Sequence, residues 1–215
     1  MLAPVAVPAP SITAVLFGLS GCLVDFGAQA GTLSTKDSQQ FVSATVARQA
    51  ADYAVATPGA VGVLKSLRKQ GIPCAWIDEY PAVIANALAE PLRGLIQPAP
   101  HPDNHWPAPD ACWQALMSLK VSQLDGCVLI SGDPRLITSG LNAGLWTIGL
   151  ASCGPLCGAS PAQWEALTDL QREQRRTRAT LKLYEIGAHS VIDHLGELES
   201  CLADIALRRM KAEKP

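Results

Sequence analysis

The segment Gly18-Leu19-Ser20-Gly21-Cys22 places a hydroxyl and a thiol directly after an apolar run, and both groups can act as nucleophiles. A hydrolase elbow of the form G-x-S-x-G needs a glycine where Cys22 stands. A catalytic thiolate needs an anion cradle with an arginine, and no Arg precedes Arg48. The glycines also do not form the G-x-G-x-x-G pattern of a dinucleotide loop. We therefore expect Cys22 to be a small packed side chain and Ser20 not to be a nucleophile.

Carboxylates follow two later apolar runs. Asp78 and Glu79 come directly after residues 72–77, and Asp133 follows residues 127–131. Both runs have the length and composition of buried strands. Because ligands of open parallel sheets bind at the carboxyl ends of the strands, Asp78 and Asp133 are candidates for a binding site.

Apolar runs alternate with helical patterns along the chain. Strands are predicted over residues 12–16, 72–77, 95–97, 127–131, 146–150 and 191–192. Helices are predicted over residues 34–56, 61–70, 81–92, 107–119, 135–142, 162–185 and 195–210, the last with Leu198, Leu202, Ile205 and Leu207 facing inward. This alternation predicts one α/β domain, residues 1–215, built as a three-layer, doubly wound and mostly parallel sheet.

Composition narrows the classes of function. The 215 residues contain 17 Lys and Arg against 19 Asp and Glu, which predicts no basic surface for nucleic acid or an anionic membrane. Residues 12–24 are too short to span a bilayer, and no basic residue precedes Lys36, so we expect a cytoplasmic protein. The seven cysteines lack C-x-x-C spacing and are expected to be reduced, packed thiols.

Several segments in a fixed order carry a family resemblance over almost the whole chain. They are Ala14-Val15-Leu16-Phe17, residues 21–27, Ser131-Gly132-Asp133, residues 141–149 and residues 187–192. With these segments the chain resembles the haloacid dehalogenase (HAD) superfamily, and within it the phosphonoacetaldehyde hydrolases. The resemblance implies a Rossmannoid core that transfers phosphoryl or phosphonyl groups through an aspartyl intermediate with Mg²⁺.

The first motif of that family departs from its pattern here. The family has D-x-D or D-x-A before G-T, and its first carboxylate attacks phosphorus and binds magnesium. In this chain Gly18 stands at the nucleophile position, Ser20 at the second carboxylate or alanine, and Cys22 at the threonine. A hydroxyl without a base is a poor nucleophile, so we expect the covalent route to be closed.

The other three motifs are also altered. Asp78 stands where the family has a neutral Ser or Thr donor, and Trp106 lies near the place of the fixed Lys or Arg. The last motif, G-D-x-x-x-D, keeps Asp133 but has Ile137 as its second member. No cofactor is expected, because one remaining carboxylate supplies too few oxygen ligands for tight Mg²⁺ binding. Arg135 is expected to pair with an acidic neighbour.

Residues 28–57 are the only candidate for the family's cap and have room for about one helix. Lys36 is the only lysine in this segment, and no matching cap motif surrounds it, so no Schiff-base role is assigned to it. The loss of most of a cap predicts an exposed apolar rim around Phe26, Trp106 and the loop from Cys153 to Cys157. Such a surface favours a protein partner or a homodimer.

The leading hypothesis is a phosphonatase-like protein without catalysis that acts by binding or regulation. The alternative is a HAD-like hydrolase that uses Asp133, Asp25 or Asp78 as a base with Ser20 or Cys22. Only this alternative would require Mg²⁺ as a cofactor. A third hypothesis is a small-ligand site formed by Ser20, Asp78, Trp106 and Asp133, which favours cations and amines over phosphates. A soft-metal site formed by Cys153, Cys157, His101 and His105 is a further alternative.

Overall fold

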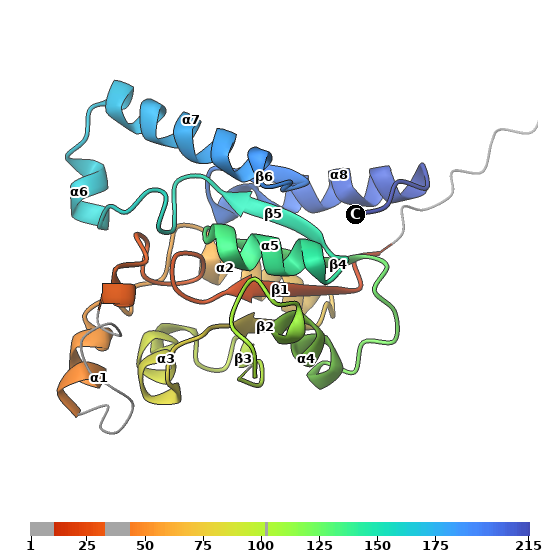
Figure 1. The fold of residues 1–215 in the computed structure, drawn as a ribbon, viewed down its shortest axis with the longest axis horizontal. Helices are drawn as coiled ribbons and strands as arrows, with labels where there is room; N and C mark the ends of the chain where they lie inside the picture. Colours follow the sequence, from red (N-terminus) through yellow and green to blue (C-terminus); the bar gives the residue numbers. More distant parts are fainter. Residues whose placement is uncertain (1–10, 33–43, 102) are drawn as a thin grey trace, which may run out of the picture.

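The computed structural model describes residues 11–32, 44–101 and 103–215. At its centre lies a six-stranded parallel sheet with the order β3-β2-β1-β4-β5-β6 (Figure 1). The strands are β1 (Ala14–Gly18), β2 (Cys74–Ile77), β3 (Gln97–Pro98), β4 (Cys127–Ser131), β5 (Trp146–Leu150) and β6 (Ser190–Ile192). The chain runs outward from β1 to β3 and returns beside β1 as β4. The predicted doubly wound α/β fold is therefore confirmed.

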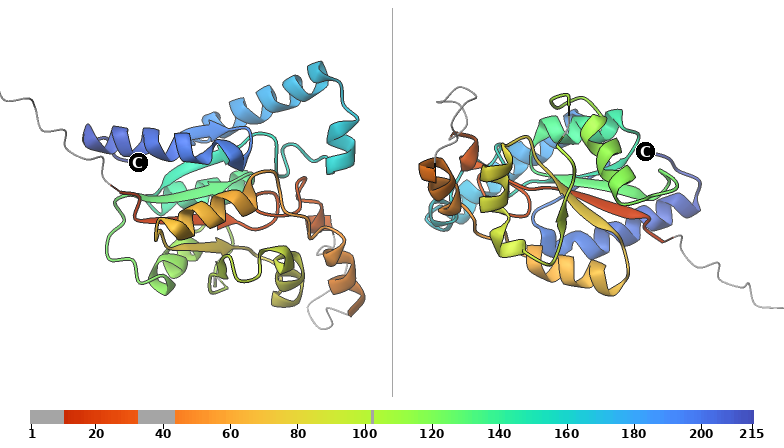
Figure 2. Two further views of the ribbon diagram at one scale, coloured as in Figure 1. Left: turned by 180° about the vertical axis from the view of Figure 1, so that it is seen from behind. Right: turned by 90° about the horizontal axis from the view of Figure 1, so that it is seen from below.

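Helices cover both faces of the sheet (Figure 2). They are α1 (Ala44–Ala51), α2 (Ala60–Lys69), α3 (Ala82–Leu88), α4 (Asp110–Ser118), α5 (Pro134–Asn142), α6 (Pro161–Glu165), α7 (Asp169–Glu185) and α8 (Leu198–Met210). Helices α2 and α8 pack on one face, and α4 and α5 pack on the other. Every residue of β1, β4 and β5 is buried, which explains why the sequence of these strands is nearly continuously apolar.

The predicted helix over residues 162–185 is two helices. Ser160 caps α6 and Thr168 caps α7, and each forms a capping box with a glutamine three residues later. Each box satisfies N–H groups that a helix start leaves without a partner, so a new helix begins at Asp169 and α6 stops at Glu165.

The predicted inward face of the last helix is correct at Leu198, Leu202 and Ile205 but wrong at Leu207, which is 52% exposed. Leu207 follows Ile205 by two residues, or about 200° around an α-helix, so it lies on the opposite face. A short 3₁₀ turn, η3 (Leu195–Glu197), precedes α8.

The segment predicted as a reduced cap contains a 3₁₀ turn, η1 (Gln29–Thr32), and α1. Helix α1 contacts α3 and ends at Ala51, earlier than the predicted end at residue 56. The predicted helix start at Ser34 and the side chain of Lys36 lie outside the described residues. Among the described helices, none is long and apolar enough to cross a membrane.

Three loops at the carboxyl end of the sheet pack backbone against backbone. A Cβ atom on Gly21 would lie 2.7 Å from the Cα of Gly154. A Cβ atom on Gly132 would lie 2.5 Å from the carbonyl oxygens of both Gly21 and Cys153. Only glycine permits approaches this close, so the loops after β1, β4 and β5 are held in contact.

Candidate functional site

A pocket of about 450 Å³ lies at the carboxyl ends of β1, β2 and β4, beside the point where the strand order switches. Its lining comes from loops that are distant in the sequence: Ser20, Ala28, Gly31, Asp78, Glu79, Tyr80, His105, Trp106, Asp133, Arg135 and Pro155. The structure thus brings together the four residues predicted as ligand-binding candidates, Ser20, Asp78, Trp106 and Asp133. Parallel strands place their carboxyl ends at one edge, which explains this convergence.

Asp78 follows β2 directly and is only 9% exposed. One of its carboxylate oxygens accepts a hydrogen bond from the Tyr80 amide at 2.7 Å, and the other lies 3.5 Å from the Ser20 amide. Burial raises the pKa of Asp78 to about 7, and the negative charge of Glu79 acts in the same direction. Near neutral pH this carboxyl is therefore only partly ionised.

The Ser20 hydroxyl is hydrogen-bonded to Asp25. It donates a hydrogen bond of 2.7 Å to the Asp25 carboxylate, which also accepts from the amides of Gln29 and Ala30, each at 2.9 Å. Asp25 is buried and is not part of the pocket lining. The pair therefore fixes the loop after β1 to the turn η1.

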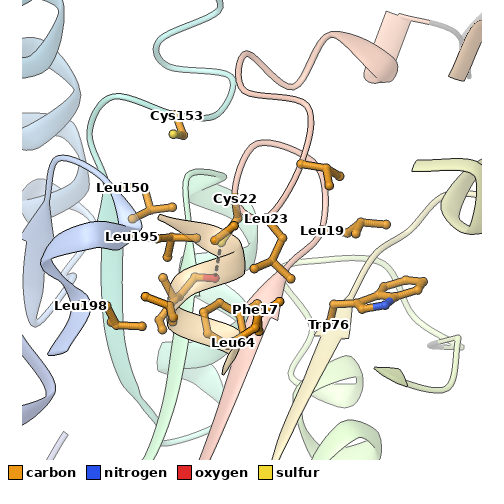
Figure 3. Packing of buried hydrophobic residues seen from close by; sticks show 14 of the residues in the cluster. Phe17, Leu19, Cys22, Leu23, Leu64, Trp76, Leu150, Cys153, Leu195 and Leu198 are labelled. Carbon is orange, nitrogen blue, oxygen red and sulfur yellow. Dashed lines mark hydrogen bonds between the residues drawn. The ribbon is translucent and has the colours of Figure 1, made fainter. Parts of the chain in front are cut away.

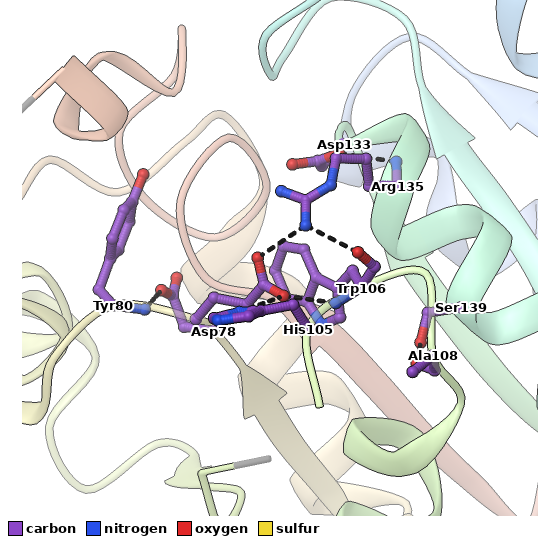
Figure 4. Close-up of polar contacts among 9 residues, drawn as sticks. Asp78, Tyr80, His105, Trp106, Ala108, Asp133, Arg135 and Ser139 are labelled. Carbon is purple, nitrogen blue, oxygen red and sulfur yellow. Dashed lines mark hydrogen bonds and ion pairs between the residues drawn. The ribbon is translucent and has the colours of Figure 1, made fainter. Parts of the chain in front are cut away.

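Arg135 supplies a cation inside the pocket. Its guanidinium lies 3.2 Å from the Glu79 carboxylate and donates a hydrogen bond of 2.8 Å to the Trp106 carbonyl (Figure 4). Glu79 also accepts a hydrogen bond from the Trp106 amide and lies 3.3 Å from Nδ1 of His105. The expectation that Arg135 pairs with an acidic neighbour is confirmed, and that neighbour is Glu79.

Asp133 forms the N-cap of α5. Its carboxylate accepts a hydrogen bond of 2.7 Å from the Arg135 amide. Burial raises the pKa of Asp133, while this hydrogen bond and the charge of Arg135 lower it. Asp133 lines the pocket from the loop after β4, whereas Asp78 lines it from the loop after β2 (Figure 4).

Comparisons with known proteins agree with this fold. The phosphonoacetaldehyde hydrolase of Klebsiella pneumoniae is 32% identical over 175 residues, which are 76% of this chain and 64% of that protein. One solved structure is 65% identical, covers 95% of this chain and 100% of its own, and has a TM-score of 0.86. A phosphonoacetaldehyde hydrolase-like protein from Oleispira antarctica is 22% identical, with 100% of both chains covered and a TM-score of 0.85. No family model matches the chain.

The chain is a phosphonoacetaldehyde hydrolase-like member of the HAD superfamily. It spans 64% of the length of the curated relative from Klebsiella pneumoniae, so it matches only part of that protein.

Gly18, assigned from the sequence to the nucleophile position, ends β1 and is closely surrounded by other side chains. A Cβ atom built there would lie 2.9 Å from Oγ of Ser131 and 3.2 Å from Cδ2 of Leu136. The space beside residue 18 is therefore filled by side chains from β4 and α5. Gly18 does not line the pocket.

Cys22, assigned from the sequence to the threonine position of the family motif, is fully buried. Its thiol contacts the carbonyl oxygen of Ile130 at 3.4 Å and packs among Phe17, Leu23 and other apolar side chains (Figure 3). Burial raises the pKa of this thiol, so the reactive thiolate is disfavoured.

The side chains at the positions expected to bind magnesium do not fit the Mg²⁺ ion of HAD enzymes. Position 18 has no side chain, and Ile137 is fully buried in a cluster with Leu183 of α7. Among the described residues, no group of three His, Cys, Asp or Glu side chains could hold a metal. The described residues thus do not bring His101, His105, Cys153 and Cys157 together as a group of metal ligands, and the soft-metal alternative gains no support.

The predicted apolar rim is wrong at most of its residues. Phe26, Cys153 and Cys157 are buried, whereas Pro155 is exposed and Trp106 and Leu156 are partly exposed. Trp164 of α6 packs against Phe26, with their ring centroids 5.8 Å apart. Helix α6, predicted only as the start of a longer helix, therefore helps to bury Phe26.

Two features of the site lay beyond the sequence prediction. Tyr80 lines the pocket beside Asp78, and Glu79 connects Arg135, His105 and the Trp106 backbone. Both residues follow β2 directly, so their position at a strand end was a usable signal. Their partners lie on other loops, and no sequence spacing indicates such contacts.

Proposed function

We propose that this protein keeps the HAD fold but not phosphoryl or phosphonyl transfer, and that it acts as a binding or regulatory protein through its pocket. The observation that carries the proposal is the closed position at Gly18. A carboxylate there would need space that Ser131 and Leu136 occupy. Without that group, the covalent intermediate of the HAD family cannot form.

The remaining motif positions support the same proposal. Asp78 replaces a neutral hydrogen-bond donor with a carboxyl group, and such a group repels a dianionic phosphate when it is ionised. Arg135, the only arginine among the described residues of the pocket lining, is already paired with the Glu79 carboxylate. Stabilisation of charge on a phosphoryl group needs free cations, commonly with a metal ion.

A second candidate function has one observation in its favour. The Ser20 hydroxyl and the Asp25 carboxylate are 2.7 Å apart, which is the distance between a nucleophile and a general base. Against this, Asp25 already accepts hydrogen bonds from two backbone amides and lies outside the pocket lining. We therefore favour the non-catalytic function.

The test is a search for turnover. Purified protein is incubated with phosphonoacetaldehyde and a panel of phosphate esters, with and without Mg²⁺, and release of phosphate is measured. We expect no turnover above the background of a protein-free control. Turnover that Ser20→Ala or Asp25→Asn removes would overturn the proposal in favour of the hydrolase. Turnover that Asp78→Asn or Asp133→Asn removes would overturn it equally, whereas turnover from a contaminating phosphatase survives all four substitutions.

A further inference from the structure

The pocket contains more negative than positive charge. Its lining includes Asp78, Glu79 and Asp133, whereas Arg135 is its only permanent cation among the described residues. The Arg135 guanidinium is already paired with Glu79 at 3.2 Å. The two aspartates are thus left as carboxyl groups without an ion pair in the part of the chain that the structure describes.

Backbone amides alone hydrogen-bond these two aspartates. Asp78 accepts from Tyr80 at 2.7 Å and has only a long, 3.5 Å contact to the Ser20 amide at its other oxygen. Asp133 accepts from the Arg135 amide at 2.7 Å. Asp78 is only 9% exposed and Asp133 is partly exposed. A carboxyl group removed from water is normally paired with a cation or stays protonated, because desolvation of its charge is costly. A bound cation would therefore stabilise the ionised forms of these two carboxyl groups.

Aromatic groups make the pocket suitable for an organic cation. The rings of Tyr80 and Trp106 line it together with small apolar residues. The protein already places one cation near an aromatic face, because the Arg135 guanidinium carbon lies 6.0 Å from the centroid of Trp106. A divalent metal would instead require several oxygen ligands around one point, and the described residues do not provide such a group.

We propose that this pocket binds a small organic ammonium ion, with its charged nitrogen between Asp78 and Asp133 and its carbon atoms against Tyr80 and Trp106. The inference rests on the proposed function, because it assigns a ligand class to the same pocket. The pocket volume of about 450 Å³ accommodates a ligand of a few heavy atoms without a change in the fold.

The binding is expected to depend on pH. Burial places the pKa of Asp78 at about 7, and the charged groups that act on this region are Glu79, Asp25, Asp133 and Arg135. An ammonium ion binds the ionised form of Asp78 and so lowers its pKa. Affinity should therefore rise as the pH passes from below to above 7.

The experiment compares two probes of the same shape and different charge. Binding of propylammonium and of 1-propanol to the full chain is measured by calorimetry at about pH 8, where Asp78 is largely ionised. The variants are Asp78→Asn and Asp133→Asn, which remove the charge but keep one side-chain oxygen to accept from the Tyr80 or the Arg135 amide; at position 78 the long contact to the Ser20 amide is lost. The control is Asp204→Asn, which removes an exposed carboxylate on α8.

We expect saturable binding of propylammonium, no binding of 1-propanol, and a loss of roughly tenfold or more in affinity in either pocket variant. Asp204→Asn should bind as the wild type does. No binding of propylammonium, equal binding of both probes, or an affinity unchanged by Asp78→Asn and Asp133→Asn would each overturn the inference. Parallel titrations with inorganic phosphate and MgCl₂ distinguish an anion site or a metal site, and either result also overturns it. Failure of the proposed function is a separate result, because that proposal fails only through turnover.

Discussion

The guanidinium of Arg135 and the carboxylate of Glu79 lie 3.2 Å apart, although 56 positions separate them in the chain. This ion pair lies at the wall of the pocket and also binds the Trp106 backbone. The Trp106 carbonyl accepts a hydrogen bond from Arg135, and the Trp106 amide donates one to Glu79. The pair therefore decides whether the pocket presents a positive charge to a ligand.

The first prediction concerns this pair. Replacement of Glu79 by Gln removes the negative charge and leaves Arg135 free, while the amide oxygen can still accept from the Trp106 backbone. We expect the variant to bind inorganic phosphate, which the wild type should not bind, because one negative charge is removed and the guanidinium of Arg135 loses its ion-pair partner. Calorimetric titration with phosphate measures the gain.

The matched control for Glu79→Gln is Glu90→Gln. Glu90 also pairs with an arginine, Arg93, but at the exposed surface and outside the pocket lining. This control should leave phosphate binding unchanged. If Glu79→Gln gives no phosphate binding, the ion pair with Glu79 is not what prevents Arg135 from binding an anion, and the prediction is wrong.

The second prediction concerns the space at Gly18. Gly18→Ala should destabilise the protein by roughly 1–3 kcal/mol, because the added methyl group overlaps Ser131 and Leu136. Gly18→Asp should destabilise it further and should not restore phosphatase activity. The free energy of unfolding from urea titration gives the first result, and a phosphate-release assay gives the second.

Gly62→Ala is the control for the glycine substitutions. Gly62 lies on the exposed side of α2, and a Cβ atom there meets nothing within 4 Å. Alanine has the higher helix propensity, so this variant should be as stable as the wild type or more stable, by up to about 1 kcal/mol. Equal effects at positions 18 and 62 would show that packing at Gly18 is not the cause.

The third prediction is a dependence of stability on pH. The pKa of Asp78 is raised from 3.8 to about 7 in the folded protein, so the folded state binds its proton more tightly than the unfolded state. The contribution of this group to stability should therefore decrease as the pH rises from about 4 to 7 and stay constant above that range. Asp25 and Asp133 also have raised pKa values and act in the same direction.

Asp78→Asn isolates this effect. The variant should be more stable than the wild type at about pH 8, by an amount on the order of a few kcal/mol, and the difference should shrink toward pH 5. Urea unfolding of both proteins across this pH range measures it. A stability difference that does not change with pH would mean that the carboxyl group of Asp78 does not titrate in this range.

The fourth prediction concerns the thiols. All seven cysteines are unpaired, six are buried, and only Cys74 is partly exposed. Burial raises the pKa of Cys22, and it raises that of Cys74 to about 12. Native protein should react slowly with a thiol reagent, Cys74 first, whereas unfolded protein should react at all seven positions. Rapid labelling of Cys22 in the native protein, detected by mass spectrometry, would contradict this prediction. It would also support the alternative in which Cys22 is a nucleophile.

The sequence predicts the elements that are buried on both sides better than it predicts contacts between loops. Strands β4 and β5 have the predicted bounds, because buried parallel strands read as continuous apolar runs. The break between α6 and α7 was missed, although Thr168 and Gln171 form a visible capping box. The pairing of Glu79 with Arg135 and the cover of Phe26 by Trp164 arise only when distant segments meet, and no local pattern encodes them.

The glycine contacts between the three loops have a consequence for the pocket wall. Ser20, Asp133 and Pro155 line the pocket, and each is the immediate neighbour of one of the packed glycines, Gly21, Gly132 and Gly154. The three loops should thus open together, as one cooperative unit, in amide hydrogen exchange. A ligand would then meet a wall that is already ordered, and little conformational entropy would be lost when it binds.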